Sequence, residues 1–225
     1  MPFTLDEERE LPHIISGPRF ATYLRATNSD VTTALSLYQW NLELSAAFIV
    51  PLQVCEIAAR NGVVLALEAR YGANWHLSQS FIQSLPNLRR GYNPRTDFTR
   101  TSSKLLRHTA LTPGKIVADI KFAFWENMLT SRHDQRLWTP SFSNAFPHAD
   151  FTVSVYQARG KANTYLEKVR GLRNRIAHHE PIFTRNIIEE YNRILEIVRW
   201  RSPISADWLA KVQEVTVING RKPIP

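Results

Sequence analysis

The chain has 225 residues, 44% of them hydrophobic and 21% charged, so it can bury a sizeable core without disulfides or metal ions. The lone cysteine, Cys55, excludes an internal disulfide, and the acidic N-terminus lacks a secretory signal, so we expect a cytoplasmic protein. The net charge of +8 favours a polyanionic partner, although GC-rich coding also enriches arginine. The apolar stretches are too short or too interrupted to predict a membrane span.

Helical spacing of apolar residues dominates the first third of the chain. It predicts a short helix at residues 17–27 and a long helical pattern from Val31, which follows an Asn-Ser-Asp capping sequence. Pro51 is expected to end or kink that helix. A further helix is then predicted from Leu52 to Tyr71, with a stop at Gly72.

The middle of the chain is less regular. Residues 74–111 are rich in proline, glycine and polar side chains, and we expect little regular structure there. A helix is predicted to start at Thr112-Pro113, because proline is favoured in a first turn. Residues 140–147 are expected to form a loop. The later helices are predicted at residues 153–178, 186–199 and 206–215.

The predicted fold class is all-α: a helical bundle with long antiparallel helices and few or no strands. Only residues 215–218 have a β-like pattern. No long Gly/Ser/Pro linker divides the chain, so residues 1–225 are interpreted as one helical domain. Its core is expected at about 30–200, with residues 1–16 and 219–225 peripheral.

The residues with the clearest chemistry close the helix predicted at 153–178. Arg173, Asn174 and His178 suit cleavage of an RNA phosphodiester, in which the 2′-hydroxyl loses a proton and the leaving 5′-oxygen gains one. Histidine titrates near neutrality, and arginine stabilises charge on the phosphoryl oxygens. The nucleophile belongs to the substrate, so we predict neither a metal nor another cofactor. Arginine and histidine also favour a helix C-terminus through its dipole alone, so this spacing by itself is a weak indicator.

Helix geometry separates the members of this group. Asn174 and His178 are four residues apart and share a face, as do Arg175 and His179. Arg173 and His178 lie about 140° apart around an ideal helix, so they converge only if the helix frays or a second subunit contributes. We therefore expect a homodimer with a composite active-site cleft. His178 is preferred over His179 as the catalytic histidine because it shares the face of Asn174, but the choice between them stays open.

The longer sequence at residues 173–180, RNRIAHHE, resembles the RN-x3-HH signature of Abi-like proteins of the AbiD/AbiF type, a branch of the HEPN superfamily. Residues 56–61, EIAARN, resemble the early helix of that family, which pairs a glutamate with Arg-Asn. FWENML at 124–129, with RLW at 136–138 and FP at 146–147, resembles its middle region. The segments occur in the family's order and cover about residues 30–200, whereas the first 30 and last 20 residues have no counterpart.

This resemblance implies a HEPN-like bundle that cleaves RNA as a metal-independent endoribonuclease of toxin or phage-defence (abortive infection) type, with a possible antitoxin. The catalytic residues it implies are Arg173, Asn174 and His178, and the supporting residues are His179, Arg175, Glu56, Arg60 and Asn61. Glu56 can also be interpreted as the partner of Arg60 in a surface ion pair one helical turn long. The alternative function is a catalytically inactive helical module that binds RNA or a protein partner through the same surface.

A basic stretch in the irregular middle region is the other candidate for RNA binding. Cations interleaved with aromatic rings suit phosphate contact and base stacking on a single strand. A solvated, mobile loop is the competing interpretation. The candidate residues are Arg89, Arg90, Arg95, Arg100, Lys104, Arg107 and Tyr92, with Phe98 interleaved. Trp40, Trp125 and Trp138 are instead expected in the core or at a dimer contact, and His133 has no assigned role.

Overall fold

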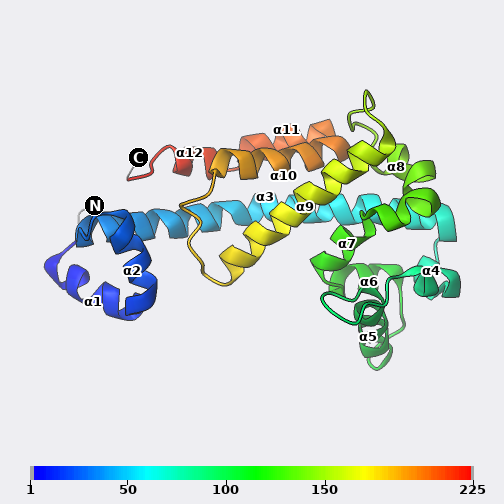
Figure 1. The fold of residues 1–225 in the computed structure, drawn as a ribbon, viewed down its shortest axis with the longest axis horizontal. Coiled ribbons are helices and arrows are strands. Elements are labelled where there is room, and N and C mark those ends of the chain that lie inside the picture. The colour runs from blue at the N-terminus through cyan, green and yellow to red at the C-terminus, as the bar shows by residue number, and fades with distance from the viewer. Residues whose placement is uncertain (1–2, 224–225) are drawn as a thin grey trace.

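The computed structural model describes residues 3–223, and every regular element in that range is helical. This confirms the predicted all-α fold. One helix, α3 (Val31–Tyr71), is 41 residues long and runs along the length of the molecule, with the other helices packed around it (Figure 1). The other helices cover α3 at its two ends and along its sides.

Helix α3 begins and ends where local chemistry predicts but does not stop in between. The carboxylate of Asp30 accepts a hydrogen bond from the backbone N–H of Thr33 at 2.6 Å, and Gly72 ends the helix with φ 80°. The prediction that Pro51 separates two helices was wrong, because α3 is continuous through it. Pro51 is itself buried, and we attribute the continuity to packing on both sides of it, which offsets an interior proline's cost of about 3 kcal/mol.

Helices from the C-terminal third cover one side of α3. Helix α10 (Ile187–Arg201) packs along α3, and α11 (Pro203–Val212) packs on α10. The short α12 (Val215–Asn219) contacts both α3 and α10, and its helical structure corrects the β-like interpretation of residues 215–218. Helix α9 (Val155–Ala177) crosses α3 obliquely (Figure 1).

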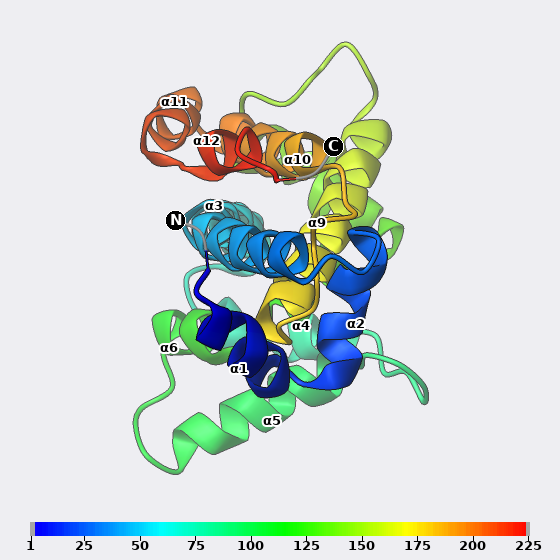
Figure 2. The ribbon, with the colours of Figure 1, turned by 90° about the vertical axis from the view of Figure 1, so that its left-hand side faces the viewer.

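The N-terminal helices close one end of the bundle. Helix α1 (Leu5–Ile15) and α2 (Gly17–Ala26) contact each other, and both contact α3. Figure 2 shows this pair beneath the start of α3, on the side where α9 ends. Phe20 and Tyr23 are buried in the contact. The N-terminal segment thus lies against the bundle, close to the end of the helix that carries the RNxxxHH residues.

An aromatic lobe covers the other end of α3. It contains η1 (Trp75–Leu77), α4 (Gln79–Ser84), α5 (Pro94–Leu106), α6 (Pro113–Asp119) and α7 (Phe122–Met128). A row of aromatic rings in contact runs through the lobe. Neighbouring ring centroids lie 5.4–5.8 Å apart, in the order Trp75, Phe81, Phe98 and Phe124. The expectation of little regular structure at 74–111 was wrong for α5, because Asn93 caps it and burial of Phe98 holds it against the lobe.

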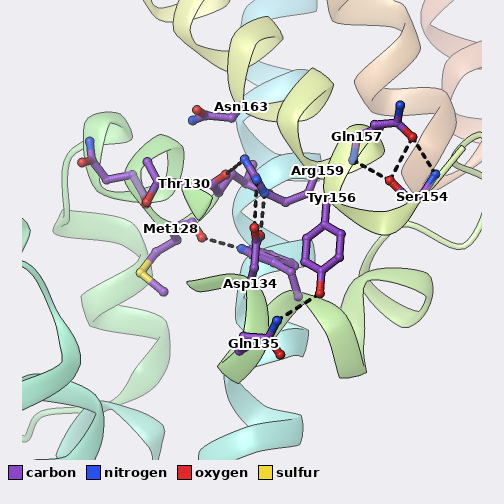
Figure 3. A network of polar contacts seen from close by, with 12 residues as sticks. Met128, Thr130, Asp134, Gln135, Ser154, Tyr156, Gln157, Arg159 and Asn163 are labelled. Carbon is purple, nitrogen blue, oxygen red and sulfur yellow. Dashed lines mark hydrogen bonds and ion pairs between the residues drawn. The ribbon is translucent and has the colours of Figure 1, made fainter. Parts of the chain in front are cut away.

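A tightly bonded segment joins the aromatic lobe to α9. It comprises η2 (Ser131–His133), the π-helical turn η3 (Asp134–Trp138) and α8 (Thr139–Ala145), so the loop predicted at 140–147 is largely a helix. Asp134 accepts hydrogen bonds from Arg159 at 2.7 and 3.0 Å, and Trp138 Nε1 donates to the Met128 carbonyl at 2.6 Å (Figure 3). Trp138 is buried, as are Trp40 and Trp125, which confirms the core interpretation of the tryptophans.

Helix α3 is also apolar enough to meet a simple criterion for a membrane span. Its most hydrophobic 18-residue window has a mean hydropathy of 1.6, and one third of that window is buried within the protein. Core helices of soluble proteins meet the same criterion. The exposed apolar side chains of α3 therefore indicate a surface that needs covering without identifying what covers it.

His133 provides a test of this packing. Burial, with Arg136 and Arg132 nearby, lowers its pKa from 6.5 to about 4. Between pH 4 and 6.5 the imidazole is therefore protonated in the unfolded chain but not in the folded chain. The contribution of His133 to the free energy of unfolding is thus fully present above pH 6.5 and is lost as the pH drops towards 4. Lowering the pH from 7 to 5 should cost about 2 kcal/mol through this residue.

Urea unfolding at pH 7 and pH 5 measures this contribution. In His133→Gln, an amide oxygen can replace Nδ1 as acceptor, and the loss of stability between the two pH values should shrink by about 2 kcal/mol. His108→Gln removes an exposed histidine and is the matched control. Equal acid sensitivity of wild type and His133→Gln would contradict the assignment.

Candidate functional site

Helix α9 ends in a turn in which His178 and His179 have different backbone conformations. It starts at a capping box of Ser154 with Gln157 and is helical to Ala177. The backbone N–H of His179 donates to the Ile176 carbonyl at 3.0 Å, and that of Glu180 donates to the Arg175 carbonyl at 2.8 Å. These are the two bonds of a Schellman motif, which places His179 at the left-handed position with φ 56°. His178 is the preceding cap residue and its side chain is exposed.

Arg175 braces the chain that leaves this turn. Its guanidinium donates to the Pro181 carbonyl at 2.8 and 3.2 Å and lies 3.3 Å from the Glu180 carboxylate. The next residue, Ile182, is anchored to α3 because its backbone N–H donates to the Asn41 side chain at 2.8 Å. Among the predicted supporting residues, Arg175 is thus positioned to hold the shape of the turn.

The cleft between the middle of α3 and the end of α9 has a volume of about 590 Å³. It brings together Glu56, Arg60 and Arg173, which are far apart in the sequence. Arg60 Nε is buried without a hydrogen-bond partner in the described chain. The proposed ion pair between Glu56 and Arg60 is not formed. Ile49, Leu52, Gln53, Ile57, Ile176 and Ala177 complete the lining.

The other two motif residues lie outside this cleft. Neither Asn174 nor His178 lines it, and the Asn174 side chain makes no hydrogen bond within residues 3–223. Only the backbone links them, through the His178 N–H and the Asn174 carbonyl at 2.9 Å. Because α9 remains helical to Ala177, fraying does not bring Arg173 and His178 together within one chain.

A second cavity of about 470 Å³ lies on the other side of the α9 terminus. Arg19, Thr22 and Tyr23 of α2 face His179 and Glu180 across it, and Ile176 lines both this cavity and the cleft. Sequence reasoning did not predict that α2 meets the motif. The helical pattern of residues 17–27 was visible, but no local pattern encodes which partner a short amphipathic helix packs against.

Asn61 lies on a different side of α3 from Arg60. It lines a cavity of about 660 Å³ between α3, α10 and α11, together with Trp208, whose side chain is 51% exposed. Ile57 lines both this cavity and the motif cleft. The described structure therefore brings Glu56 and Arg60 to Arg173 but places Asn61 next to an exposed apolar surface.

Most of the basic stretch at 89–107 belongs to helix α5, and only some of its side chains are free at the surface. Tyr92 donates a hydrogen bond to Asp97 at 2.6 Å, and burial, with that bond, raises its pKa. Arg95 bonds to the Leu85 carbonyl at 3.0 Å, Lys104 lies 2.9 Å from Asp119, and Phe98 is fully buried. Tyr92 and Phe98 are thus engaged within the protein. The predicted RNA-binding residues that remain exposed and outside ion pairs within residues 3–223 are Arg89, Arg90, Arg100 and Arg107.

Comparisons with known proteins assign no relative. No protein-family model, curated protein or solved structure matches the chain. Within residues 3–223, no three side chains of histidine, cysteine, aspartate or glutamate form a group that could hold a metal ion. The residues that line the cleft and close α9 are therefore the features of this chain that bear on its function.

The turn geometry predicts how the two histidines differ on substitution. A side chain in the left-handed region is strained, and glycine adopts it freely. His179→Gly should therefore raise the free energy of unfolding by up to about 1 kcal/mol. His178→Gly should bring no such increase, because His178 has a φ of −94°, which any residue adopts without strain. Urea unfolding of the two glycine variants measures this difference. A His179→Gly variant less stable than wild type would mean that the imidazole makes contacts that outweigh the backbone strain.

Proposed function

We propose that the protein is a metal-independent endoribonuclease of the toxin or phage-defence kind, related to the Abi-like branch of the HEPN superfamily. In this proposal Arg173 and Arg60 hold the scissile phosphate, His178 transfers a proton, and Asn174 binds a phosphate oxygen or orients the imidazole. The supporting observation is the meeting of the EIAARN and RNRIAHHE segments at one cleft. These two segments are far apart in the sequence, and each contributes an arginine to the cleft: Arg60 from the first and Arg173 from the second.

Charge and burial at the cleft favour a phosphodiester as its ligand. Arg60 has a buried Nε with no acceptor, and Arg173 is exposed and free of ion pairs in the described residues. A phosphate provides the acceptor oxygens that such donors need. In this scheme the Glu56 carboxylate, on the same wall, holds the guanidinium groups in place when substrate enters.

The active site in this proposal is composite. His178 is exposed and does not line the cleft that holds Arg173, so in this proposal a second copy brings its own His178 to the first copy's arginines. Helix α3 offers a surface for this contact: Leu42, Ile49, Val50 and Ile57 lie on one face and are each 43–47% exposed. Ile49 and Ile57 also line the cleft, so a two-fold contact on this face would carry both motifs to the axis.

A binding module without catalysis is the second candidate, and one observation favours it. Within the described residues, the side chains of Asn174 and His178 make no hydrogen bond and do not line the cleft of Arg173 and Arg60. An assembly that never aligns them would bind RNA or a protein partner and leave it intact. A cytoplasmic location and an antitoxin partner belong to the proposal only through the resemblance.

Cleavage of RNA in the presence of EDTA tests the enzyme. Wild type should degrade a structured RNA with EDTA present, and His178→Ala should be slower by roughly 100-fold or more, because a proton-transfer group is lost. His179→Gly is the matched control and should keep most of its activity. The 3′ ends of the products should carry phosphate or cyclic phosphate. RNA that is bound but uncut by wild type would leave the binding module as the function.

Mixing two inactive variants tests the composite site. Arg173→Ala and His178→Ala each inactivate the homodimer, but a heterodimer of the two retains one intact site if the groups come from different chains. After subunit exchange, activity should return to about a quarter of wild type. Ile57→Asp, which charges the exposed face of α3, should give a folded, inactive monomer by light scattering. Full activity of a strictly monomeric protein would contradict this arrangement.

A further inference from the structure

A basic pocket lies at the opposite end of α3 from α1 and α2. Its volume is about 410 Å³, and it is formed by the end of α3, the π-helical turn η3 and the start of α8. Figure 1 shows α8 at the end of the molecule away from the N-terminal helices. The lining residues are Ala69, Arg70, Gln135, Arg136, Pro140 and Ser141.

Three arginines gather here without a carboxylate. Arg70 and Arg136 line the pocket, and Arg132 lies near enough that burial, together with the charges of Arg132 and Arg70, lowers the pKa of Arg136. In the part of the chain that the structure describes, none of the three forms an ion pair. Positive charge is therefore concentrated at this pocket, and within residues 3–223 no carboxylate lies within ion-pair distance of it.

The acidic residue of the π-helical turn is already paired. Asp134 belongs to the same turn as Arg136, but Arg159 binds both of its carboxylate oxygens, at 2.7 and 3.0 Å (Figure 3). The same figure shows Gln135, on the pocket wall, donating to the Tyr156 hydroxyl at 3.0 Å. The turn is thus held in place by α9, and Arg136 is left without an anionic partner.

Buried donors next to the pocket also lack acceptors. Arg136 Nη2 lies 2.6 Å from His133 Nδ1, and the lowered pKa of His133 keeps the imidazole neutral, so Nδ1 accepts this bond. Arg136 Nε, His133 Nε2 and the Tyr71 hydroxyl are all buried without a hydrogen-bond partner in the described residues. Unpaired buried donors are uncommon, and an anion with several oxygens is the kind of ligand that satisfies them.

We propose that this pocket binds a phosphate group, either as free phosphate or as the phosphate of a small phosphorylated ligand such as a mononucleotide. The guanidinium of Arg136, held by His133, contacts the phosphate oxygens, and Arg70 at the rim supplies a second fork. The Ser141 hydroxyl, from the first turn of α8, is a neutral donor on the same wall. This site is separate from the Arg173 cleft and does not depend on the proposed ribonuclease activity.

Thermal unfolding of the whole protein at pH 7.5 and constant ionic strength tests the site with inorganic phosphate as the probe. Phosphate should raise the melting temperature saturably, as a ligand of the folded state does, whereas equivalent chloride should not. Arg136→Gln should weaken the response at least about tenfold, the effect of losing a charge-assisted hydrogen bond. Arg70→Gln, an exposed position that folding should tolerate, should also weaken it.

Two further variants separate this pocket from other sources of phosphate binding. Arg9→Gln removes one exposed charge from α1 and should leave the response unchanged. Arg173→Gln removes one of the two arginines of the motif cleft, so any phosphate binding there weakens, whereas the part of the response that depends on Arg136 should persist. An equal response in wild type, Arg136→Gln and Arg70→Gln, or loss of the response in Arg173→Gln alone, would overturn the proposal.

The ligand's source follows from two additional probes. A 5′-mononucleotide that stabilises the protein at lower concentration than phosphate, while its nucleoside has no effect, would identify a phosphorylated small molecule. Equal stabilisation by the nucleotide and by inorganic phosphate would identify the free anion as sufficient. Stabilisation by the nucleoside alone would contradict recognition of phosphate.

Discussion

Helix α3 carries apolar side chains around most of its circumference, and the need to cover them arranges the rest of the molecule. Helices α2, α8, α9, α10 and α12 all pack on it, and the interior Pro51, which is buried like the Leu52 that follows it, does not break the helix. Both walls of the motif cleft depend on this arrangement: Glu56 and Arg60 are part of α3, and the chain that leaves α9 is tied to α3 through Asn41.

The same helix leaves one apolar stripe uncovered, and this stripe borders the cleft. Ile49 and Ile57 are each about 45% exposed and contribute to the cleft wall. A site that lacks part of its chemistry and lies next to an unpartnered apolar face has the form expected of a shared active site in a two-fold dimer. In the proposed dimer, Arg173 and His178 diverge on α9 because each of them serves a different copy's site.

Buried cationic donors without a hydrogen-bond partner occur at two separate places in the described chain. Arg60 contributes a buried donor at the motif cleft, and Arg136 contributes one at the other end of α3. Elsewhere, arginines such as Arg159 and Arg175 are tied to carboxylates or carbonyls. The net positive charge is thus divided between structural pairs, which hold the bundle together, and a few groups that remain available to an external anion.

The sequence by itself determined the helical class, the boundaries of α2 and α9, the start and stop of α3, and the buried tryptophans, because periodicity, caps and side-chain apolarity act locally. It did not predict the continuity of α3 through Pro51, helices α5 and α8, or the packing of α2 beside the motif. Those features depend on burial against distant segments, as when Phe98 joins the ring cluster with Trp75 and Phe81. The left-handed backbone of His179 and the gathering of Arg70, Arg132 and Arg136 around His133 were likewise decided only by tertiary structure, because turn geometry and proximity across the chain are not encoded in residue spacing.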